Sequence, residues 1–287
     1  MPNGEFTRQG IQAQPEWLTQ VPTDRRFPDA RVLLTGCGTS FHAAQTGGEA
    51  LQALELVLAP RPDAELLVLL SHEGTTPLTL EAARAFPGPK WCVTAVAESP
   101  IAQLCEEVFV STPEVEKSYC HTASYTCAVA ALAALRGEDV AWLSGAVAAA
   151  IADPFPVSDH ERWLVAGAGR DWPTAQEAVL KLREGAFVAA EAHETEQLLH
   201  GYLAAIDESV RCFVLEGVGR GAERAHGAVA ALEALGCDAT LVPTVHPVVD
   251  IVRFQVLTVE LAAARGVDPD LIRRDDERWA RARAAYE

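Results

Sequence analysis

The segment 177–201, EAVLKLREGAFVAAEAHETEQLLHG, carries ionisable side chains at spacings that would let them act together on one ligand. Good helix formers and the absence of proline predict one helix over 174–192. Apolar residues lie nearly all round this helix, so we expect it to be largely buried. Lys181, Glu184 and Glu191 would share one face of it, because Glu184 is three and Glu191 ten residues after Lys181.

The residues HETEQ then lead to His200, which brings an acid, a cation and an imidazole into one short stretch of chain. Buried charges cost several kcal/mol unless they are paired or functional. Two interpretations are open. The helix either carries a catalytic acid–base group, or it is a surface helix with ordinary salt bridges, such as Lys181 with Glu177 four residues earlier.

Two short turns follow apolar strands and have the composition of anion-binding turns. GCGTS at 36–40 follows the expected strand 31–35, and SHEGTT at 71–76 follows the expected strand 66–70. Ligands of parallel α/β sheets sit outside the carboxyl ends of the strands, where amides and hydroxyls at helix amino termini attract anions. The candidate binding residues are Gly38, Thr39, Ser40, Ser71, His72, Glu73 and Thr76. Each turn alone also fits an ordinary strand-to-helix turn with N-cap residues.

Composition excludes several classes of protein. The chain has 287 residues, 49% of them hydrophobic and 22% charged, which is typical of a soluble globular protein. Its formal net charge of −17 argues against nucleic acids and anionic membranes as partners. The amino terminus has no signal-peptide core, and the longest apolar run, 127–135, is too short to span a bilayer. Seven scattered cysteines without a CxxC pair predict reduced thiols, a cytoplasmic location and no zinc site.

Apolar strands that alternate with helices predict βαβ units and parallel sheets covered on both faces. In the first half we expect a helix at 5–18 ending near Pro15, and a helix from the turn 36–40 to about residue 54. Further strands are expected at 91–96 and 107–110, before a long helix opened by EKSYCHTASYT at 116–126. The second half should contain strands at 211–216 and 239–243 and helices near 220–235 and 249–264.

RVLLTGCG at 31–38 recurs 131 positions later as RWLVAGAG at 162–169, which indicates an internal repeat. ADPFPVSD at 152–159 has the composition of a linker. The predicted fold class is therefore α/β, with two doubly wound parallel-sheet halves in tandem. Their predicted bounds are 1–155, with an N-terminal helix, and 156–287, with a charged C-terminal tail.

These motifs resemble the tandem sugar isomerase (SIS) domain family, whose halves are flavodoxin-like. The resemblance rests on GCGTS, on the Ser-x-x-Gly-x-Thr turn at 71–76 and on LKLREGAFVAAEAHETEQLLHG, and it runs from about residue 14 to about 265. The chain is most like the isomerase half of glucosamine-6-phosphate synthase and stand-alone phosphosugar isomerases and deaminases. The synthase's glutaminase half is expected to be missing.

The resemblance implies a role for each candidate residue. Ser40, Ser71 and Thr76 would hold a sugar phosphate, with Thr39 beside them. Glu184 would move a proton between C1 and C2 through an enediol or enolamine, which a carboxylate can do when burial raises its pKa. Lys181 would bind near the reacting centre. His200 would open the sugar ring from a neighbouring subunit, which implies a homodimer.

Four positions depart from the family's usual pattern. Glu73 stands where a hydroxyl donor is usual, and a carboxylate repels phosphate unless a protonated His72 offsets it. Ala123 stands where a lysine is common, Tyr202 replaces the proline after the ring-opening histidine and its glycine, and the last twenty residues contain arginines but no lysine. The ligand is thus either an amino or unphosphorylated sugar bound by Glu73, or a hexose 6-phosphate with Glu73 pointing away.

We therefore expect a cytoplasmic, homodimeric sugar isomerase or deaminating isomerase that needs no metal or organic cofactor. A deglycase activity stays open. The alternative from another class is a catalytically silent sugar-binding or regulatory protein, because this fold also serves in regulators. Such a sensor would not need Glu184, Lys181 and His200 together.

Overall fold

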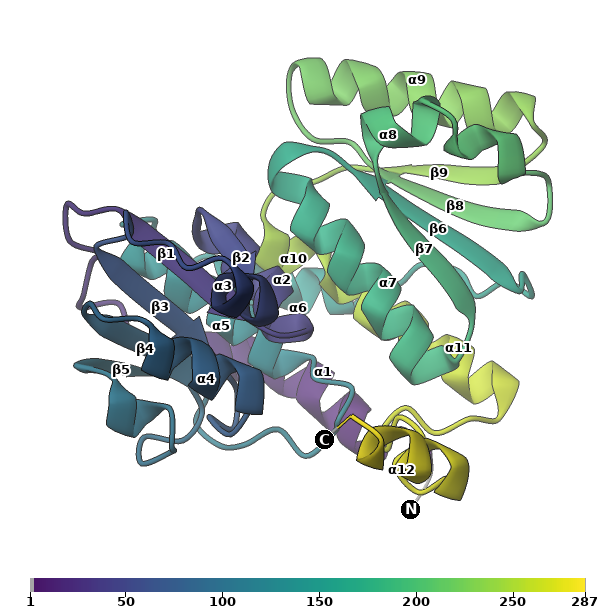
Figure 1. Ribbon diagram of the computed structural model, residues 1–287. Coiled ribbons are helices and arrows are strands. Elements are labelled where there is room, and N and C mark those ends of the chain that lie inside the picture. Colours follow the sequence, from purple (N-terminus) through teal and green to yellow (C-terminus); the bar gives the residue numbers. More distant parts are fainter. Residues whose placement is uncertain (1–2, 287) are drawn as a thin grey trace.

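The computed structural model describes residues 3–286 of the chain (Figure 1). The first half contains α1 (Glu5–Leu18), β1 (Val32–Gly36), α2 (Thr39–Gly47), β2 (Ala50–Gln52), α3 (Ala53–Leu58), β3 (Leu66–Leu70), α4 (Pro77–Ala85), β4 (Lys90–Thr94), β5 (Glu107–Val110), α5 (Ala123–Leu135) and α6 (Leu143–Ile151). The second contains β6 (Arg162–Gly167), α7 (Trp172–Ala186), β7 (Ala189–Glu194), α8 (Thr195–Leu199), β8 (Val210–Leu215), α9 (Arg220–Ala234), β9 (Asp238–Val242), α10 (Pro247–Asp250), α11 (Val252–Arg265) and α12 (Glu277–Ala284).

Two parallel sheets confirm the predicted fold class. The first has the order β2-β1-β3-β4-β5, and the second has the order β7-β6-β8-β9. All of their strand pairs are parallel, and β1 lies against both β2 and β3. Strands that are buried on both faces explain continuous apolar runs such as LLVLL in β3, where every residue is buried.

The two halves share a central hydrophobic core, and each half also has a smaller cluster of its own. A single cluster of buried residues runs from Trp17 of α1 through Leu132 of α5 and Leu182 of α7 to Leu257 of α11. Figure 1 shows these helices between the two sheets. The predicted boundary at residue 155 falls in the connection between α6 and β6, and it stays a prediction. Because the helix layer is shared, side chains from both halves can reach one site.

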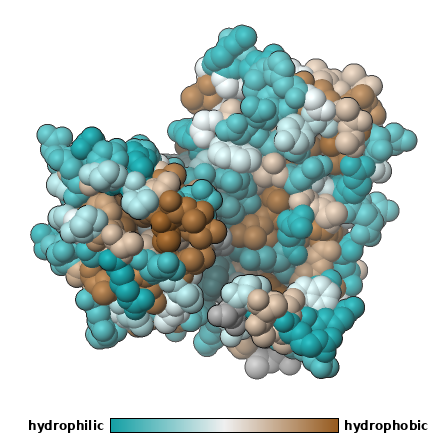
Figure 2. Space-filling view, viewed as in Figure 1, coloured by the Kyte–Doolittle hydropathy of each residue, from teal (hydrophilic) through white to brown (hydrophobic). Residues whose placement is uncertain are grey.

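Figure 2 shows the molecule as two lobes with a hollow between them. An apolar area marks the first lobe where α3 lies, and Leu54 and Leu58 of α3 are exposed. No helix among residues 3–286 is long and apolar enough to cross a membrane. All seven cysteines are free thiols.

The single helix predicted over 174–192 is wrong in its second part. It ends at Ala186, because Phe187 adopts a left-handed conformation with φ 56°. Residues 189–194 then form strand β7, which pairs with β6 from Arg162 to Gly167. Pairing with β6 thus overrides the helical propensity of this alanine-rich segment. Glu191 consequently lies on a strand and shares no helix face with Lys181.

Three further boundaries differ from the prediction. The helix after β1 ends at Gly47 instead of residue 54, because Gly48 has φ 147°, which favours glycine. Helix α1 continues past Pro15 to Leu18. Proline cannot donate to the carbonyl of Ile11, but Gln14 Nε2 donates to it at 3.3 Å instead. The segment 116–122 is an irregular loop, and α5 begins only at Ala123.

Candidate active site

A cavity of about 510 Å³ lies outside the carboxyl ends of β1 and β3. The strand order reverses between these two strands, since β2 follows β1 on one side and β4 follows β3 on the other. Ligands of doubly wound folds bind at this switch point. The cavity volume suits a small ligand such as a sugar. Residues from β-strand ends, α5, α7 and the C-terminal tail line it.

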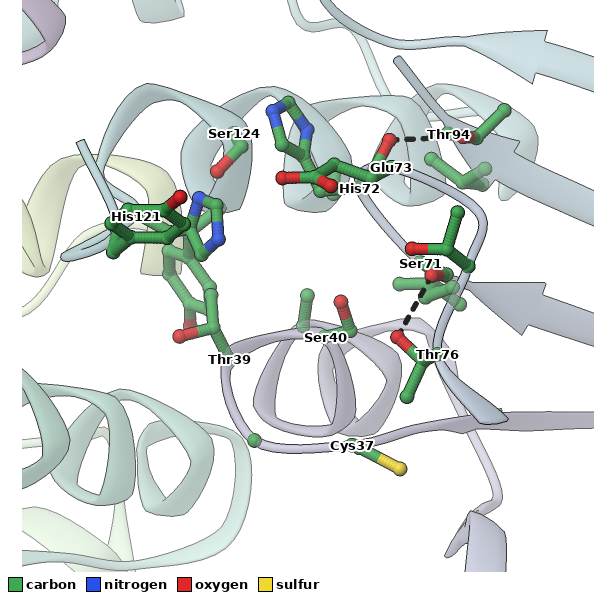
Figure 3. Close-up of a pocket in the computed structure, with 18 of the residues that line it drawn as sticks. Cys37, Thr39, Ser40, Ser71, His72, Glu73, Thr76, Thr94, His121 and Ser124 are labelled. Carbon is green, nitrogen blue, oxygen red and sulfur yellow. Dashed lines mark hydrogen bonds between the residues drawn. The ribbon is translucent and has the colours of Figure 1, made fainter. Parts of the chain in front are cut away.

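The turn 36–40 forms one wall, as predicted (Figure 3). Gly38 has φ 55°, and its turn places Thr39 and Ser40 in the first turn of α2. Thr39 Oγ1 donates to Glu177 Oε1 at 3.0 Å and accepts from Lys181 Nζ at 3.2 Å. Thr39 therefore links the first half to helix α7 of the second.

The turn 71–76 forms the opposite wall. Ser71 Oγ and Thr76 Oγ1 lie 3.1 Å apart, and Glu73 lines the same cavity. Gly74 has φ 70°, and a Cβ there would come within 2.2 Å of Ser99 Oγ. The turn therefore needs glycine at this position to hold its hydroxyls in place.

A protonated His72, one of the possibilities raised by the sequence, is contradicted by its contacts. His72 Nε2 accepts a hydrogen bond from the backbone amide of Glu116 at 2.9 Å, so that nitrogen carries no proton. Burial lowers the pKa of His72, although the carboxylates of Glu116 and Glu73 act in the other direction. A neutral His72 does not offset the charge of Glu73.

Helix α7 supplies an ion-pair group to the cavity edge. Lys181 Nζ lies 2.9 Å from Glu184 Oε2 and 3.4 Å from Glu177 Oε1. Burial disfavours the charged lysine, but the two carboxylates outweigh it and raise the pKa of Lys181 above its usual value. Glu184 lines the cavity, whereas Lys181 is fully buried behind it. The Lys181–Glu177 ion pair is thus present, and Glu184 of the same helix lines the cavity, so the two interpretations of this helix do not exclude each other.

Glu177 is held from the other side by the first half. His42 Nδ1 lies 2.7 Å from Glu177 Oε2, and the carboxylate is completely buried. Burial alone would raise the pKa of Glu177, but Lys181 and His42 lower it below its usual value. The carboxylate is thus ionised and fixes Lys181 in place.

The loop before α5 contributes residues that the sequence analysis did not assign to the site. Glu116 is 5% exposed and accepts from the amides of Thr122, Ala123 and Ser124 at 2.7–3.2 Å. His121 and Ser124 line the cavity, and His121 Nδ1 and Ser124 Oγ are buried without a hydrogen-bond partner. Unpartnered buried polar atoms are costly, so they point to a ligand that would satisfy them. Their position after the carboxyl end of β5 could have predicted that they lie at the ligand-binding edge of the sheet.

The C-terminal tail also reaches the cavity. Ile272 and Arg274 line it, and Arg274 is the one lysine or arginine among the described residues that do so. The guanidinium of Arg274 stacks on Tyr119 at 4.0 Å. Arg273, with φ 60°, stacks between Phe187 and Trp279 at 4.1 and 4.2 Å. The tail arginines noted in the sequence thus include a cation at this cavity.

His200 lies apart from the cavity of its own chain. It follows α8, its side chain is 72% exposed, and its Nε2 lies 2.8 Å from Glu196 Oε1. Glu191, on β7, is half exposed and pairs with His193. The structure therefore brings together Glu184 and the two turns, but not His200.

The fold of the chain has counterparts among solved structures. The chain superposes on the C-terminal domain of glucosamine-fructose-6-phosphate aminotransferase from Francisella tularensis with a TM-score of 0.78, at 20% identity, over 93% of this chain and 98% of that one. It also superposes on glucosamine-6-phosphate deaminase from Thermotoga maritima with a TM-score of 0.74, at 21% identity, over 93% and 97% of the two chains. For tagatose-6-phosphate ketose/aldose isomerase from Escherichia coli the TM-score is 0.75, at 17% identity, over 94% and 95%.

The chain has the tandem sugar isomerase fold. In sequence it is similar to glutamine–fructose-6-phosphate aminotransferases: 26% identical over 310 residues to the protein from Zymomonas mobilis and 26% over 244 residues to that from Rhizobium leguminosarum. These matches cover 84% and 69% of the chain, but only 50% and 40% of the relatives. No protein-family model matches the chain. The predicted resemblance to sugar isomerase domains is confirmed.

Proposed function

We propose that this protein is a sugar isomerase or deaminating isomerase that moves a proton between C1 and C2 of its substrate. The observation that carries the proposal is the position of Glu184: its carboxylate edges a cavity whose other walls are two hydroxyl-bearing turns. Relatives in sequence and fold are named as aminotransferases, deaminases and isomerases of sugar phosphates, which supports this class of reaction.

In this mechanism Glu184 takes the proton from one carbon and returns it to the neighbouring carbon. The intermediate is an enediol, or an enolamine when the substrate carries nitrogen. Lys181 acts through Glu184: it fixes the carboxylate at 2.9 Å and is itself fixed by Glu177. A single carboxylate suffices for this transfer, because C1 and C2 are adjacent.

Binding is assigned to the two turns and the tail. Gly38, Thr39, Ser40, Ser71 and Thr76 present backbone and hydroxyl groups, and Arg274 presents a cation. Glu73 carries a negative charge into the same cavity, next to a neutral His72. We therefore favour a substrate that offers an amino group or hydroxyls to Glu73 over one whose phosphate faces it.

A homodimer is part of the proposal, since the resemblance implies one. The side chain of His200 is 72% exposed and does not line the cavity of its own chain, so it could act only at the cavity of a second copy. Light scattering of the full chain measures this assembly. We also propose a cytoplasmic location, supported by the seven free thiols.

The test is proton NMR in deuterated buffer with four sugars: glucosamine 6-phosphate, fructose 6-phosphate, and both without phosphate. The proposal expects deuterium at C1 or C2 of at least one sugar, and its loss in Glu184→Gln. Binding of a sugar without any exchange would instead support the silent sugar-binding protein.

A further inference from the structure

The internal repeat places a second turn where the first half has a wall of its candidate active site. GCGTS at 36–40 corresponds to GAGRD at 167–171, so Thr39 corresponds to Arg170. The first of these turns lines the active-site cavity, whereas the second does not. Where the first half presents a hydroxyl, the second half therefore presents a guanidinium.

A second cavity, of about 210 Å³, lies at this repeated turn. Arg170 follows the carboxyl end of β6, and His246 follows that of β9. The strand order β7-β6-β8-β9 reverses between β6 and β8, and ligands of doubly wound folds bind at such a reversal. The first half forms the opposite wall with Gln45 and Thr46 of α2 and with Arg136 after α5. The cavity thus lies where the two halves meet.

Two arginines give this cavity a positive lining. Burial lowers the pKa of His246, Glu138 raises it, and both Arg170 and Arg136 lower it further, so both guanidiniums act on a neutral imidazole. Glu138 is the only carboxylate among the described residues of the lining, and it lies 3.3 Å from Arg136 Nε. Two guanidiniums against one carboxylate leave a local positive charge in a chain whose formal net charge is −17.

Arg170 keeps donors available for a ligand. Its Nε lies 3.8 Å from Asp171 Oδ1, and its Nη2 donates to the carbonyl of Val245 at 3.5 Å, which are both long contacts. Its side chain is 50% exposed. A guanidinium has five N–H donors in a planar fork that fits the oxygens of an anion. Arg170 can therefore bind an anion without breaking a short contact to its own chain.

Gln45 adds an amide that lacks a partner. Its Oε1 is buried and has no hydrogen-bond partner in the part of the chain that the structure describes. Buried polar atoms without partners are costly, so they point to a ligand. The amide can also turn over and present its NH₂ group instead. Gln45 can thus accept from a hydroxyl of a ligand or donate to an anionic oxygen.

We propose that this second cavity binds a phosphate group, carried by inorganic phosphate or by a small phosphate monoester. Guanidiniums on two walls can share the several oxygens of a phosphate, whereas a carboxylate offers only two. The cavity has less than half the volume of the active-site cavity, so the ligand is smaller than the substrate. Helix α5 separates the two cavities, because Ala128 lines the first and Val129 the second. This site does not depend on the proposed isomerase function.

Trp142 provides a local signal for the test. Its ring packs edge-on against His246 with centroids 5.9 Å apart, and its side chain is half exposed. The experiment follows tryptophan fluorescence while the full chain is titrated with inorganic phosphate, with glycerol 3-phosphate, and with sodium chloride at matched ionic strength. We expect a saturable change with both phosphates and none with chloride, and we expect Trp142→Phe to abolish it. The tighter of the two phosphates identifies the source of the phosphate group.

Charge-matched variants locate the site. Arg170→Gln, and Arg136→Gln from the other half, should each weaken phosphate binding about tenfold. Arg31→Gln removes the same charge at an exposed position before β1 and should change the affinity less than about twofold. Arg274→Gln, at the active-site cavity, should leave the Trp142 signal unchanged.

Several results would overturn the proposal. The first is the absence of a saturable change with either phosphate, and the second is an equal change with chloride. A change that persists in Trp142→Phe, or that is lost in Arg274→Gln, would place the binding elsewhere. Equal affinities of Arg170→Gln and Arg31→Gln would show that the guanidinium at the repeated turn does not touch the phosphate.

Discussion

Glu184 Oε2 lies 2.9 Å from Lys181 Nζ, yet the glutamate side chain is 27% exposed and the lysine side chain only 1%. The pair therefore has one partner that a ligand can reach and one that it cannot. A buried lysine between two carboxylates stays charged, and it sets the position of the reachable one. This asymmetry is what a fixed, accessible proton acceptor requires.

Removing the lysine charge should destabilise the fold more than removing an exposed one. Lys181→Met leaves Glu177 buried without its cation, which costs about 3–5 kcal/mol in unfolding free energy. Urea denaturation measures the loss. Lys117→Met, at an exposed position, is the control and should change stability by less than about 0.5 kcal/mol. Equal effects of the two substitutions would show that Lys181 is not a buried ion-pair partner.

Glu73 should set the preference between phosphorylated and free sugars. Glu73→Gln removes a negative charge from the cavity wall and should tighten binding of sugar phosphates about tenfold relative to the free sugars, or about 1.4 kcal/mol. Isothermal titration calorimetry with both forms of one sugar measures the ratio. Glu81→Gln, on the exposed side of α4, is the control. An unchanged ratio in Glu73→Gln, or in Glu73→Ser, would contradict the role of this carboxylate.

Arg274 should attract the phosphate group of a sugar phosphate, whereas Glu73 should repel it. Arg274→Gln removes the cation that the tail brings to the cavity and should weaken binding of sugar phosphates about tenfold, with a smaller effect on free sugars. Arg273→Gln is the neighbouring control, because its guanidinium stacks on Phe187 and Trp279 instead. Salt-titrated binding should separate the two: only the arginine that touches the ligand changes the salt dependence.

A buried carboxyl outside the site predicts a pH effect on stability. Burial raises the pKa of Asp250 from 3.8 to about 7, against the hydrogen bonds from Val245 and His246. The folded state therefore holds a proton that the unfolded state has lost between these values, so this group's stabilisation is present below pH 3.8 and is lost as pH rises through about 7. Asp250→Asn should remove that decline, by up to about 1.4 kcal/mol per pH unit. Unfolding curves from pH 4 to 8 that decline equally in both proteins would contradict it.

Most sheet strands were predictable because their apolar runs are continuous and end at glycine-bearing turns, as in LLVLL before Ser71, but β2 and β7 lie within segments predicted to be helical. A short stretch of sequence does not reveal its pairing partner, so the alanine-rich segment 189–194 predicts a helix although it pairs with β6 as a strand. Helix α7 ends where Phe187 adopts a left-handed backbone conformation, which a phenylalanine does not predict. Helix α1 continues through Pro15 while the side chain of Gln14 donates to the carbonyl of Ile11. The sequence pattern does not reveal this contact.

The cavity-lining residues that belong to sequence motifs were predictable, whereas those brought to the cavity by tertiary contacts were not. Thr39, Ser71 and Glu184 line one cavity as expected. His121 and Arg274 join it only because a loop after β5 and a C-terminal tail, far apart in the chain, fold against the same strand ends. His72 is neutral because its Nε2 accepts from the backbone amide of Glu116, 44 residues further along the chain. The sequence around His72 does not predict this contact.

The central claim is that Glu184 carries a proton between C1 and C2. The most direct test uses fructose 6-phosphate and glucosamine 6-phosphate labelled with deuterium at the carbon that loses its hydrogen. A single carboxylate on one face should pass part of the label to the neighbouring carbon, and Glu184→Gln should slow label movement at least about 100-fold while the protein stays folded. Label that moves equally fast in Glu184→Gln would contradict the account.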